Sequence, residues 1–284
     1  MGYKLKGVLP VKRTTKQNFG IHLILLGAVL LTVVPYIWMF LTSVKTQGES
    51  IMVPPKLFPE IWRWDNYKIL FQTLPFDKFF FNTFVSTVII TVVQVFFCAM
   101  AAYSFARLKF PGKKTIFILI LSIMMVPGQI YLIPQYMIIQ KLGLLNTISA
   151  LILPSLFSAY GTFLLINFFE SVPMSLEEAA IIDGCSYPQI FFKIMLPLVV
   201  PGLIALAILV SLWSWNSLMW PLIVNSSTDK MTLSAGLANL SGRAGTKYPL
   251  LMAGSVLASV PMITFFFLLQ KKFIAGISMS GSKG

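Results

Sequence analysis

The sequence predicts an all-α integral membrane protein with six transmembrane helices and both termini in the cytoplasm. Of its 284 residues, 57% are hydrophobic and only 11% are charged, whereas a soluble domain carries roughly 25% charged residues. Six stretches are long and apolar enough to cross the hydrocarbon layer, which needs about 20 helical residues, and none contains Lys, Arg, Asp or Glu. This composition excludes an ordinary soluble domain and a disordered chain.

The six predicted spans follow one another along nearly the whole chain. They are Phe19–Val44, Phe79–Ala106, Thr115–Ile139, Ile148–Phe169, Ile194–Val224 and Pro249–Leu269. The first is too long for the apolar core of a signal peptide, so we expect it to be retained. The chain is thereby divided into an N-terminal tail (1–18), a six-helix transmembrane domain (19–270) and a C-terminal tail (271–284).

The basic residues predict the orientation. The net charge is +13, and more than half of the 22 Lys and Arg residues fall in segments that are cytoplasmic if the N-terminal tail is cytoplasmic. The bias is strongest in that tail and in the turn from Arg107 to Lys114, and basic residues near span ends favour the cytoplasmic side. In so apolar a chain, the positive charge indicates membrane orientation and gives no reason to expect nucleic-acid binding.

Two connections on the predicted outer side are long. The first, 45–78, contains several prolines together with Trp62 and Trp64, and such aromatic residues suit the membrane interface. The second, 225–247, is rich in Ser, Thr, Gly and Asn, and we expect it to be mobile.

The chain lacks the residues that several kinds of chemistry need. It contains no G-x-x-x-x-G-K-[ST] phosphate loop, so it has no visible means of hydrolysing ATP. A single histidine, His22, and the isolated Cys98 and Cys185 give no metal-ligand spacing and no disulfide framework. The spans carry no charged side chain of the kind that proton relays use. A transport protein with this sequence is therefore expected to take its energy from another polypeptide.

The connection between the fourth and fifth spans, 170–200, is predicted to form two short helices. Ser175, with Glu178 three residues later, matches a capping box, and Gly184 suits the left-handed turn that ends a helix. Ser186 begins a second capping-box pattern. Because helices this short are marginal on their own, the pair is expected to pack against something, either the lipid headgroups or another protein.

The same connection contains the run Glu178-Ala179-Ala180-Ile181-Ile182-Asp183-Gly184, followed by Leu196-Pro197 and Pro201. This resembles the E-A-A-x-x-D-G loop of permease subunits in binding-protein-dependent ABC importers, which also lies between the fourth and fifth of six spans. Further runs resemble the carbohydrate branch of that family, in particular the maltose-importer inner-membrane subunit that lacks an extra N-terminal region. They include Asn66-Tyr67, Ala101-Ala102-Tyr103-Ser104-Phe105-Ala106-Arg107, Trp215-Asn216 and Leu250-Leu251-Met252-Ala253-Gly254.

The resemblance implies a type I ABC importer permease fold in the cytoplasmic membrane of a prokaryote. It implies four partners: a second permease subunit, two ATPase subunits and an extracytoplasmic sugar-binding protein. ATP and Mg²⁺ would be bound by the ATPase, with no cofactor in this chain. The residues that would couple the chain to the ATPase are Glu178, Ala179, Ala180, Asp183 and Gly184. Glu178 also has a purely structural interpretation as the acid of a capping box.

Two further sets of residues are candidates for contact with the solute and with its carrier. In relatives, a loop at the position of 225–247 enters the cleft of the binding protein, which assigns that role to Ser241, Gly242, Gly245 and Thr246. In the fifth span, Trp213, Asn216 and Trp220 are spaced to share one helical face. An aromatic face stacks on sugar rings and an amide bonds their hydroxyls, so we expect these side chains to line a sugar path, together with Gln129 and Gln135 of the third span.

Simpler roles remain open for some of these residues, and other functions for the chain. Trp220 is also suited to anchoring the membrane interface, and Asn216 to bonding a neighbouring helix. The same machinery would serve glycerol-phosphate, a polyol, a peptide or another small solute. A membrane-embedded enzyme would need acids clustered at one face, and the only acidic cluster is explained by helix caps. A secondary carrier would transport without any ATPase.

Overall fold

A computed structural model describes residues 15–242 and 245–281, with side chains from 20 to 241 and from 245 to 270. The basic residues of the N-terminal tail up to Arg13, on which the predicted orientation partly depends, lie outside the described residues. The chain is almost entirely helical, with one two-stranded hairpin in the described residues. The all-α prediction is therefore confirmed.

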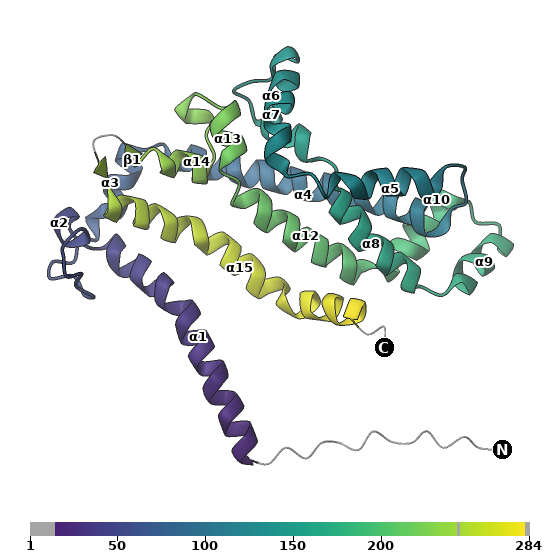
Figure 1. Ribbon diagram of the computed structural model, residues 1–284, viewed down its shortest axis with the longest axis horizontal. Helices are drawn as coiled ribbons and strands as arrows, with labels where there is room; N and C mark the ends of the chain where they lie inside the picture. Colours follow the sequence, from purple (N-terminus) through teal and green to yellow (C-terminus); the bar gives the residue numbers. More distant parts are fainter. Residues whose placement is uncertain (1–14, 243–244, 282–284) are drawn as a thin grey trace.

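Three helices are each long and apolar enough to cross a membrane, and they correspond to the first, second and sixth predicted spans. They are α1 (Thr15–Ser43), α4 (Phe76–Arg107) and α15 (Tyr248–Gly281). The last of them is longer than expected, because helix α15 continues through most of the predicted C-terminal tail as far as Gly281. Figure 1 shows that α4 runs through the body of the molecule, whereas α1 leaves it as a separate rod.

The other three predicted spans are bent pairs of helices, which brings the total to six if each pair crosses the membrane once. The third span joins α5 (Lys113–Ile123) to η1 (Gly128–Tyr131) and α6 (Leu132–Lys141) with a bend of 94°. The fourth joins α7 (Ile148–Ile152) and η2 (Leu153–Ser155) to α8 (Ala159–Ser171) with a bend of 48°. The fifth joins α10 (Tyr187–Ile190), η3 (Phe191–Met195) and α11 (Leu196–Leu198) to α12 (Val200–Trp215) with a bend of 77°. Pro127, Pro154 and Pro197 lie at or beside these bends, where a ring removes a backbone donor and interrupts the helix.

The fifth predicted span, Ile194–Val224, is not one continuous helix, and its main helix ends earlier than expected. Helix α12 begins only at Val200, after a break at Val199, and it ends at Trp215. A separate short helix, α13 (Met219–Val224), follows. The apolar run is continuous in sequence, but Pro201 favours a new helix start and Asn216 follows the last helical residue, so that one hydrophobic stretch forms two helices.

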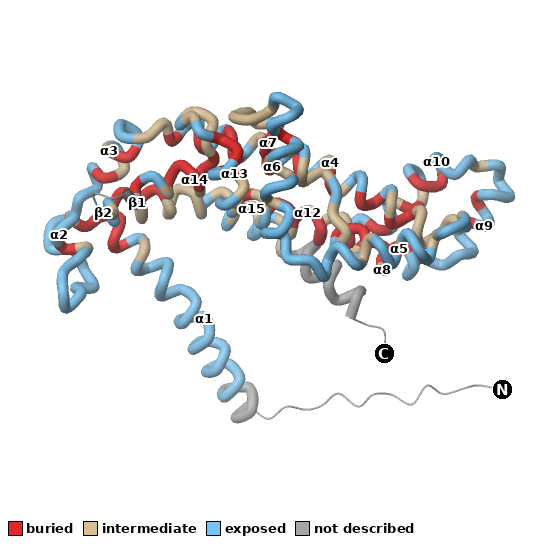
Figure 2. Tube along the Cα trace, turned by 45° about the horizontal axis from the view of Figure 1, so that its top comes forward, coloured by how far each residue is buried: buried red, intermediate tan, exposed pale blue. Residues whose placement is uncertain are grey.

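The helices pack in pairs along the length of the molecule. Helix α4 contacts α8 and α12, and α15 contacts α12 and α1. Figure 2 shows many of the buried residues along α4, α8 and α12, while α1 is exposed from residue 20 to 38 and buried only at its last residues, 41–43. Helices α12 and α8 approach closely at Gly202 of α12, where an added Cβ would lie 2.5 Å from the ring of Phe168 in α8. Only glycine permits this approach.

Two groups of short elements lie at opposite ends of the long axis in Figure 1. One end, called the α9 end, carries α9 (Met174–Ile182) and α10. The other, called the α2 end, is built from short elements. They are α2 (Gln47–Ser50), α3 (Asp65–Thr73), η4 (Thr228–Lys230), α14 (Leu233–Ala238), β1 (Ser241–Gly242) and β2 (Gly245–Thr246).

Candidate functional site

Helix α9 does not begin with the predicted capping box. It starts at Met174, with Pro173 at the cap position and no side-chain cap bond. Ser175 therefore lies inside the first turn, where its hydroxyl is not in the cap position. The physical reason is that Pro173, with φ fixed at −58°, already has a backbone angle suited to a helix start. Glu178 is left without the capping role that competed with partner contact.

The end of α9 is formed as predicted. Gly184 has φ +81°, and two backbone bonds close the turn: the Gly184 N–H donates to Ile181 at 3.0 Å and the Cys185 N–H to Ala180 at 2.9 Å. This pair of bonds is a Schellman motif, which needs a left-handed residue after the helix. The second predicted capping box is also confirmed, because the Ser186 N–H donates to Gln189 Oε1 at 2.8 Å. The α9–α10 turn is thus a rigid elbow.

Four of the five predicted coupling residues face outward. Glu178, Ala179, Asp183 and Gly184 are exposed, whereas Ala180 is only 5% exposed and packs in the core cluster that includes α10. Beside them Ile182 is 85% exposed. The elbow therefore presents a small surface in which an apolar side chain lies between acidic ones, and Ala180 supports that surface from beneath.

A buried polar group beneath the same helix was not predicted from the sequence. Glu177, on the inner face of α9, accepts a 2.9 Å hydrogen bond from the Tyr103 hydroxyl at its Oε1. Its Oε2 lies 3.7 Å from Nε of Arg107, and each of these two side chains is 6% exposed. Tyr103 and Arg107 lie one turn apart at the end of α4, a spacing that places them on one helical face. The spacing of Tyr103 and Arg107 was the feature of the sequence that could have predicted this shared contact.

A cavity of about 790 Å³ opens where the bent spans meet α4. All five residues predicted for the solute path line it: Gln129, Gln135, Trp213, Asn216 and Trp220. Its other walls come from Ser86 and Ile90 of α4, from the ends of α7 and α12, and from α13. The described lining contains no acidic or basic side chain. The helix breaks thus bring together residues from spans three, four and five.

The expectation that three of these residues share one helical face is wrong. Trp213 lies in α12 and Trp220 in α13, and the helix is interrupted between them after Trp215. Two of the polar groups are already bonded inside the chain: the Trp220 indole donates to the Ala150 carbonyl at 2.9 Å and the Asn216 amide to Leu212 at 2.8 Å. The contact of Asn216 is within its own helix, so it does not bond a neighbouring helix as the alternative supposed.

The remaining three residues are free to bind a ligand. Within the described part of the chain, the side chains of Gln129, Gln135 and Trp213 make no hydrogen bond, and Trp213 is 69% exposed. Among the described residues, no cluster of three or more His, Cys, Asp or Glu side chains suits a metal. The cavity therefore offers one aromatic face and two unpaired amides, which is the chemistry of an uncharged, hydroxyl-rich ligand.

Part of the second long outer connection, which its composition predicted to be mobile, is hydrogen-bonded to α4. The Asn82 side chain donates to the carbonyls of Asp229 and Met231, both at 2.9 Å, and Thr83 Oγ1 accepts the Leu233 N–H at 2.8 Å. The segment around residues 229–233 is therefore held against the N-terminal part of α4. Asn and Ser are frequent in loops, but here the polar side chains satisfy backbone groups and hold the segment in place.

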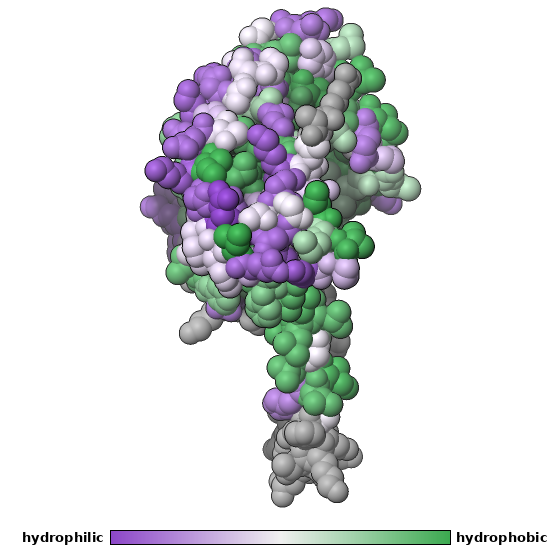
Figure 3. All heavy atoms as spheres, turned by 90° about the vertical axis from the view of Figure 1, so that its left-hand side faces the viewer, coloured by the Kyte–Doolittle hydropathy of each residue, from purple (hydrophilic) through white to green (hydrophobic). Residues whose placement is uncertain are grey.

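The four residues predicted to meet a binding protein form a short hairpin beyond this fastened segment. Ser241 pairs with Thr246 and Gly242 with Gly245, and the Gln47 side chain donates to the Thr246 carbonyl at 2.8 Å. Figure 1 places the strands at the α2 end, and Figure 3 shows that this end of the molecule is covered largely by hydrophilic residues, in contrast to the hydrophobic α1. The hairpin is thus part of a largely hydrophilic surface, to which the Gln47 side chain binds it.

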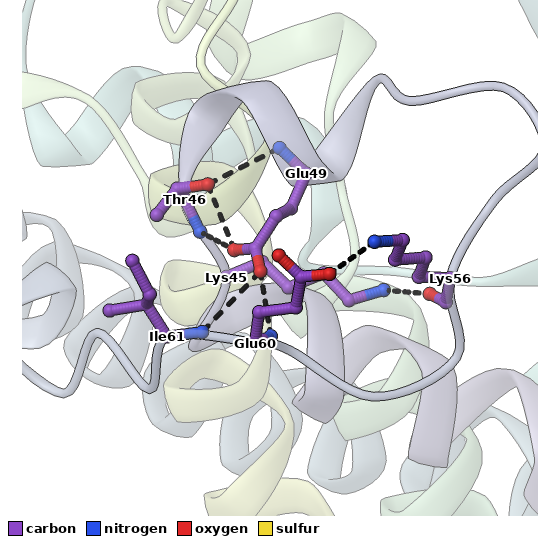
Figure 4. Close-up of polar contacts among 6 residues, drawn as sticks. All are labelled: Lys45, Thr46, Glu49, Lys56, Glu60 and Ile61. Carbon is purple, nitrogen blue, oxygen red and sulfur yellow. Dashed lines mark hydrogen bonds and ion pairs between the residues drawn. The ribbon is translucent and has the colours of Figure 1, made fainter.

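The first outer connection is organised around Glu49 (Figure 4). Its carboxylate accepts the N–H groups of Thr46 at 2.8 Å and Glu60 at 2.7 Å, and the Thr46 hydroxyl at 2.8 Å. The bond from the Thr46 N–H is the largest cause that lowers the pKa of Glu49 to about 2, and the Glu60 N–H adds to it. Beside it the buried Lys45 donates to the Lys56 carbonyl at 2.5 Å. One ionised carboxylate thereby closes the segment from 46 to 61.

Comparison with known proteins bears on all three regions. The family model of the "binding-protein-dependent transport system inner membrane component" matches residues 94–278. The permease protein AraQ of the arabinooligosaccharides transport system of Bacillus subtilis is 38% identical over 258 residues, which cover 90% of this chain and 92% of AraQ. The permease protein SugB of the trehalose transport system of Mycobacterium tuberculosis is 34% identical over 254 residues, covering 88% and 92%.

A solved structure supports the fold. A chain of a bacterial ABC transporter involved in import of the acidic polysaccharide alginate superposes with a TM-score of 0.79 at 24% identity, covering 93% of this chain and 99% of that one. The matched family region contains the α9–α10 elbow, the bent spans and all of the cavity lining except Ser86 and Ile90 of α4. The chain therefore belongs to the family of inner membrane components of binding-protein-dependent transport systems.

Proposed function

We propose that this chain is a permease subunit of an ATP-driven ABC importer for uncharged sugars, most simply oligosaccharides, and that it forms half of the translocation pore. Membership of the family makes it a multi-pass protein of the inner membrane that transports and does not itself transform its solute. The names of AraQ and SugB, which refer to arabinooligosaccharides and trehalose, support a carbohydrate as the cargo. The other half of the pore is a second permease subunit.

The observation that carries the choice of cargo is the chemistry of the cavity. Trp213 offers an aromatic face, and Gln129 and Gln135 offer amides with no internal partner. A buried anion would require a cationic or metal partner, and the described lining provides neither charge nor metal ligands. This argues against glycerol-phosphate, the alternative that the sequence left open. A neutral polyol fits the same lining but would cover less of it.

The α9 end is the surface for the ATPase. The elbow is capped at both helices, presents Glu178, Ala179 and Asp183 outward, and is rigid enough to act as one body. ATP and Mg²⁺ are bound by two ATPase subunits at this end, in the cytoplasm. The hairpin at the α2 end, on the opposite side of the membrane, meets an extracytoplasmic sugar-binding protein.

The experiment is ATP hydrolysis by the complete importer in proteoliposomes, with its binding protein present. Trehalose, arabinooligosaccharides, glycerol 3-phosphate and oligogalacturonate are compared at equal concentrations. We expect hydrolysis to be stimulated by one of the two neutral saccharide classes and not by the two anions. Stimulation by an anion alone would overturn the proposed cargo, and transport without ATP hydrolysis would overturn the importer itself.

A further inference from the structure

The buried contact between α9 and α4 links the proposed ATPase surface to the cavity wall. Helix α4 is one uninterrupted helix of 32 residues. Its far half lines the cavity through Ser86 and Ile90, and its last turn holds Tyr103 and Arg107 against Glu177 of α9. One unbroken helix therefore connects the inner face of α9 with the wall of the cavity.

Arg107 also holds the segment that precedes α9. Its Nη2 donates to the carbonyls of Phe169 and Val172 at the C-terminus of α8, where the helix dipole favours a positive charge. Its Nη1 lies 3.1 Å from Sδ of Met174, the first residue of α9. One guanidinium thus joins the ends of α4 and α8 to the start and the inner face of α9.

The surroundings make this junction stiff. The Tyr103 ring packs against Phe169 with centroids 5.8 Å apart and against Phe191 at 5.3 Å. Within the described residues, Arg107 Nε and Glu177 Oε2 are buried without a hydrogen-bond partner, so their ion pair is their remaining polar interaction. Burial strengthens such an interaction and makes the loss of one partner costly.

The other connection from α9 to the cavity is more compliant. It passes through α10, the π-helical η3 and α11, and then bends by 77° before α12. Proline and π-helical turns are where helices bend. This path contains Pro197 and Pro201, whereas the path through Tyr103, Arg107 and α4 contains no such break.

We propose that Tyr103, Arg107 and Glu177 form a latch, defined by these three side chains, that makes α9 move as one body with α4 and α8. The latch transmits ATPase closure to the cavity wall. This rests on the proposed function in one respect only, namely that α9 is the element on which the ATPase acts. Glu177 is a positioning residue, since it touches neither the ATPase surface nor the solute path.

The test uses the complete importer, with Glu177→Gln and Tyr103→Phe as latch variants and Glu170→Gln as the matched control. Glu170 is an exposed acid at the end of α8, so its variant removes the same charge without touching the latch. We expect both latch variants to assemble and hydrolyse ATP, but to transport at least fivefold less solute per ATP. The control should keep the wild-type ratio. A wild-type ratio in both latch variants would overturn the proposal.

A second measurement separates the latch from the identity of the cargo. Spin labels at Ser175 in α9 and Lys109 just after α4, both exposed positions, report the distance between the two elements without and with ATP. We expect one narrow, unchanged distance in the otherwise wild-type complex and a broadened distribution with Glu177→Gln. A distance that shifts by several ångströms on ATP binding in the otherwise wild-type complex would overturn the latch, whatever solute is carried.

Discussion

The indole nitrogen of Trp220 donates a 2.9 Å hydrogen bond to the carbonyl of Ala150. This bond fastens α13 to α7 across one side of the cavity, whereas the Trp213 indole makes no hydrogen bond within the described chain and is 69% exposed. Two tryptophans that line the same cavity therefore have different roles. One holds the wall in place, and the other is available to a ligand.

The first prediction separates these two roles. Trp213→Ala should lower the rate of sugar uptake about tenfold, because a tenfold change in affinity corresponds to about 1.4 kcal/mol and a stacking face is removed. The thermal unfolding temperature of the purified complex should not change. Uptake of radiolabelled sugar and a melting curve check both parts.

The matched variant is Trp220→Phe, which keeps an aromatic ring but leaves the Ala150 carbonyl without its donor. It should lower the free energy of unfolding by about 1 kcal/mol and leave uptake per folded complex nearly unchanged. The opposite pattern, with Trp213 acting on stability and Trp220 on uptake, would show that the roles are reversed.

The second prediction concerns the turn at Gly184. Gly184→Asp should abolish uptake while the subunit remains inserted, because a second acid beside Asp183 puts negative charge at a helix C-terminus, where it is unfavourable. In the matched variant Gly184→Asn, the new side chain has nearly the same shape as Asp but no charge. Asn also tolerates the left-handed φ of +81° at this position, so this variant should keep most uptake. Transport assays on membranes with matched permease levels decide this, and full uptake by the Asp variant would remove the coupling role from this turn.

The third prediction is a pH dependence centred on Glu49. Since its pKa in the folded chain, about 2, is lower than the ordinary value, the ionised carboxylate stabilises the fold above about pH 4.5. This stabilisation should diminish as the pH falls from about 4.5 towards 2, because the carboxylate then becomes protonated. Limited proteolysis between residues 46 and 61 should therefore accelerate over this range.

Glu49→Gln is the control for that measurement. The variant should be cleaved faster at pH 7 than the wild type and should show little further acceleration at low pH. If the wild type and the variant respond to acid equally, another group governs the stability of this segment.

The fourth prediction concerns the hairpin at the α2 end. Replacement of residues 241–245 by a shorter turn should impair release of sugar from the binding protein but spare assembly of the complex. The deletion must leave Leu240 in place, because this residue is 5% exposed and belongs to the core at that end. Binding-protein-stimulated ATP hydrolysis, compared with complex yield, measures the effect, and unchanged stimulation would refute an extracting role.

Properties that depend on local sequence were predictable. The long apolar runs indicate helical spans, because the backbone N–H and C=O groups of a chain inside lipid must form hydrogen bonds with each other. The roles of Gly184 and Ser186 are recognisable because helix caps depend on a few adjacent residues. The elbow and its exposed acids follow from the same local rules. Even here Pro173 displaced the cap expected at Ser175, since two residues competed for one helix start.

Properties that depend on distant partners were not predictable in this way. Glu177 is one of two consecutive acids, and only the packing of α9 on α4 shows that it is buried against Tyr103. The apolar run through Asn216 does not reveal that the helix stops there, and the polar loop after Val224 does not reveal that Asn82 holds it. In each case a contact between segments far apart in the chain decides the local structure.

The most direct test of the account is disulfide or bifunctional crosslinking from α9 to the ATPase in native membranes, in a background without Cys98 and Cys185. Ala179 is exposed and Ala180 is buried beneath it, so cysteines at these neighbouring positions form a matched pair. The account predicts a crosslink from Ala179→Cys to a nucleotide-hydrolysing subunit and little or none from Ala180→Cys. Failure of Ala179→Cys to reach any such subunit would contradict it.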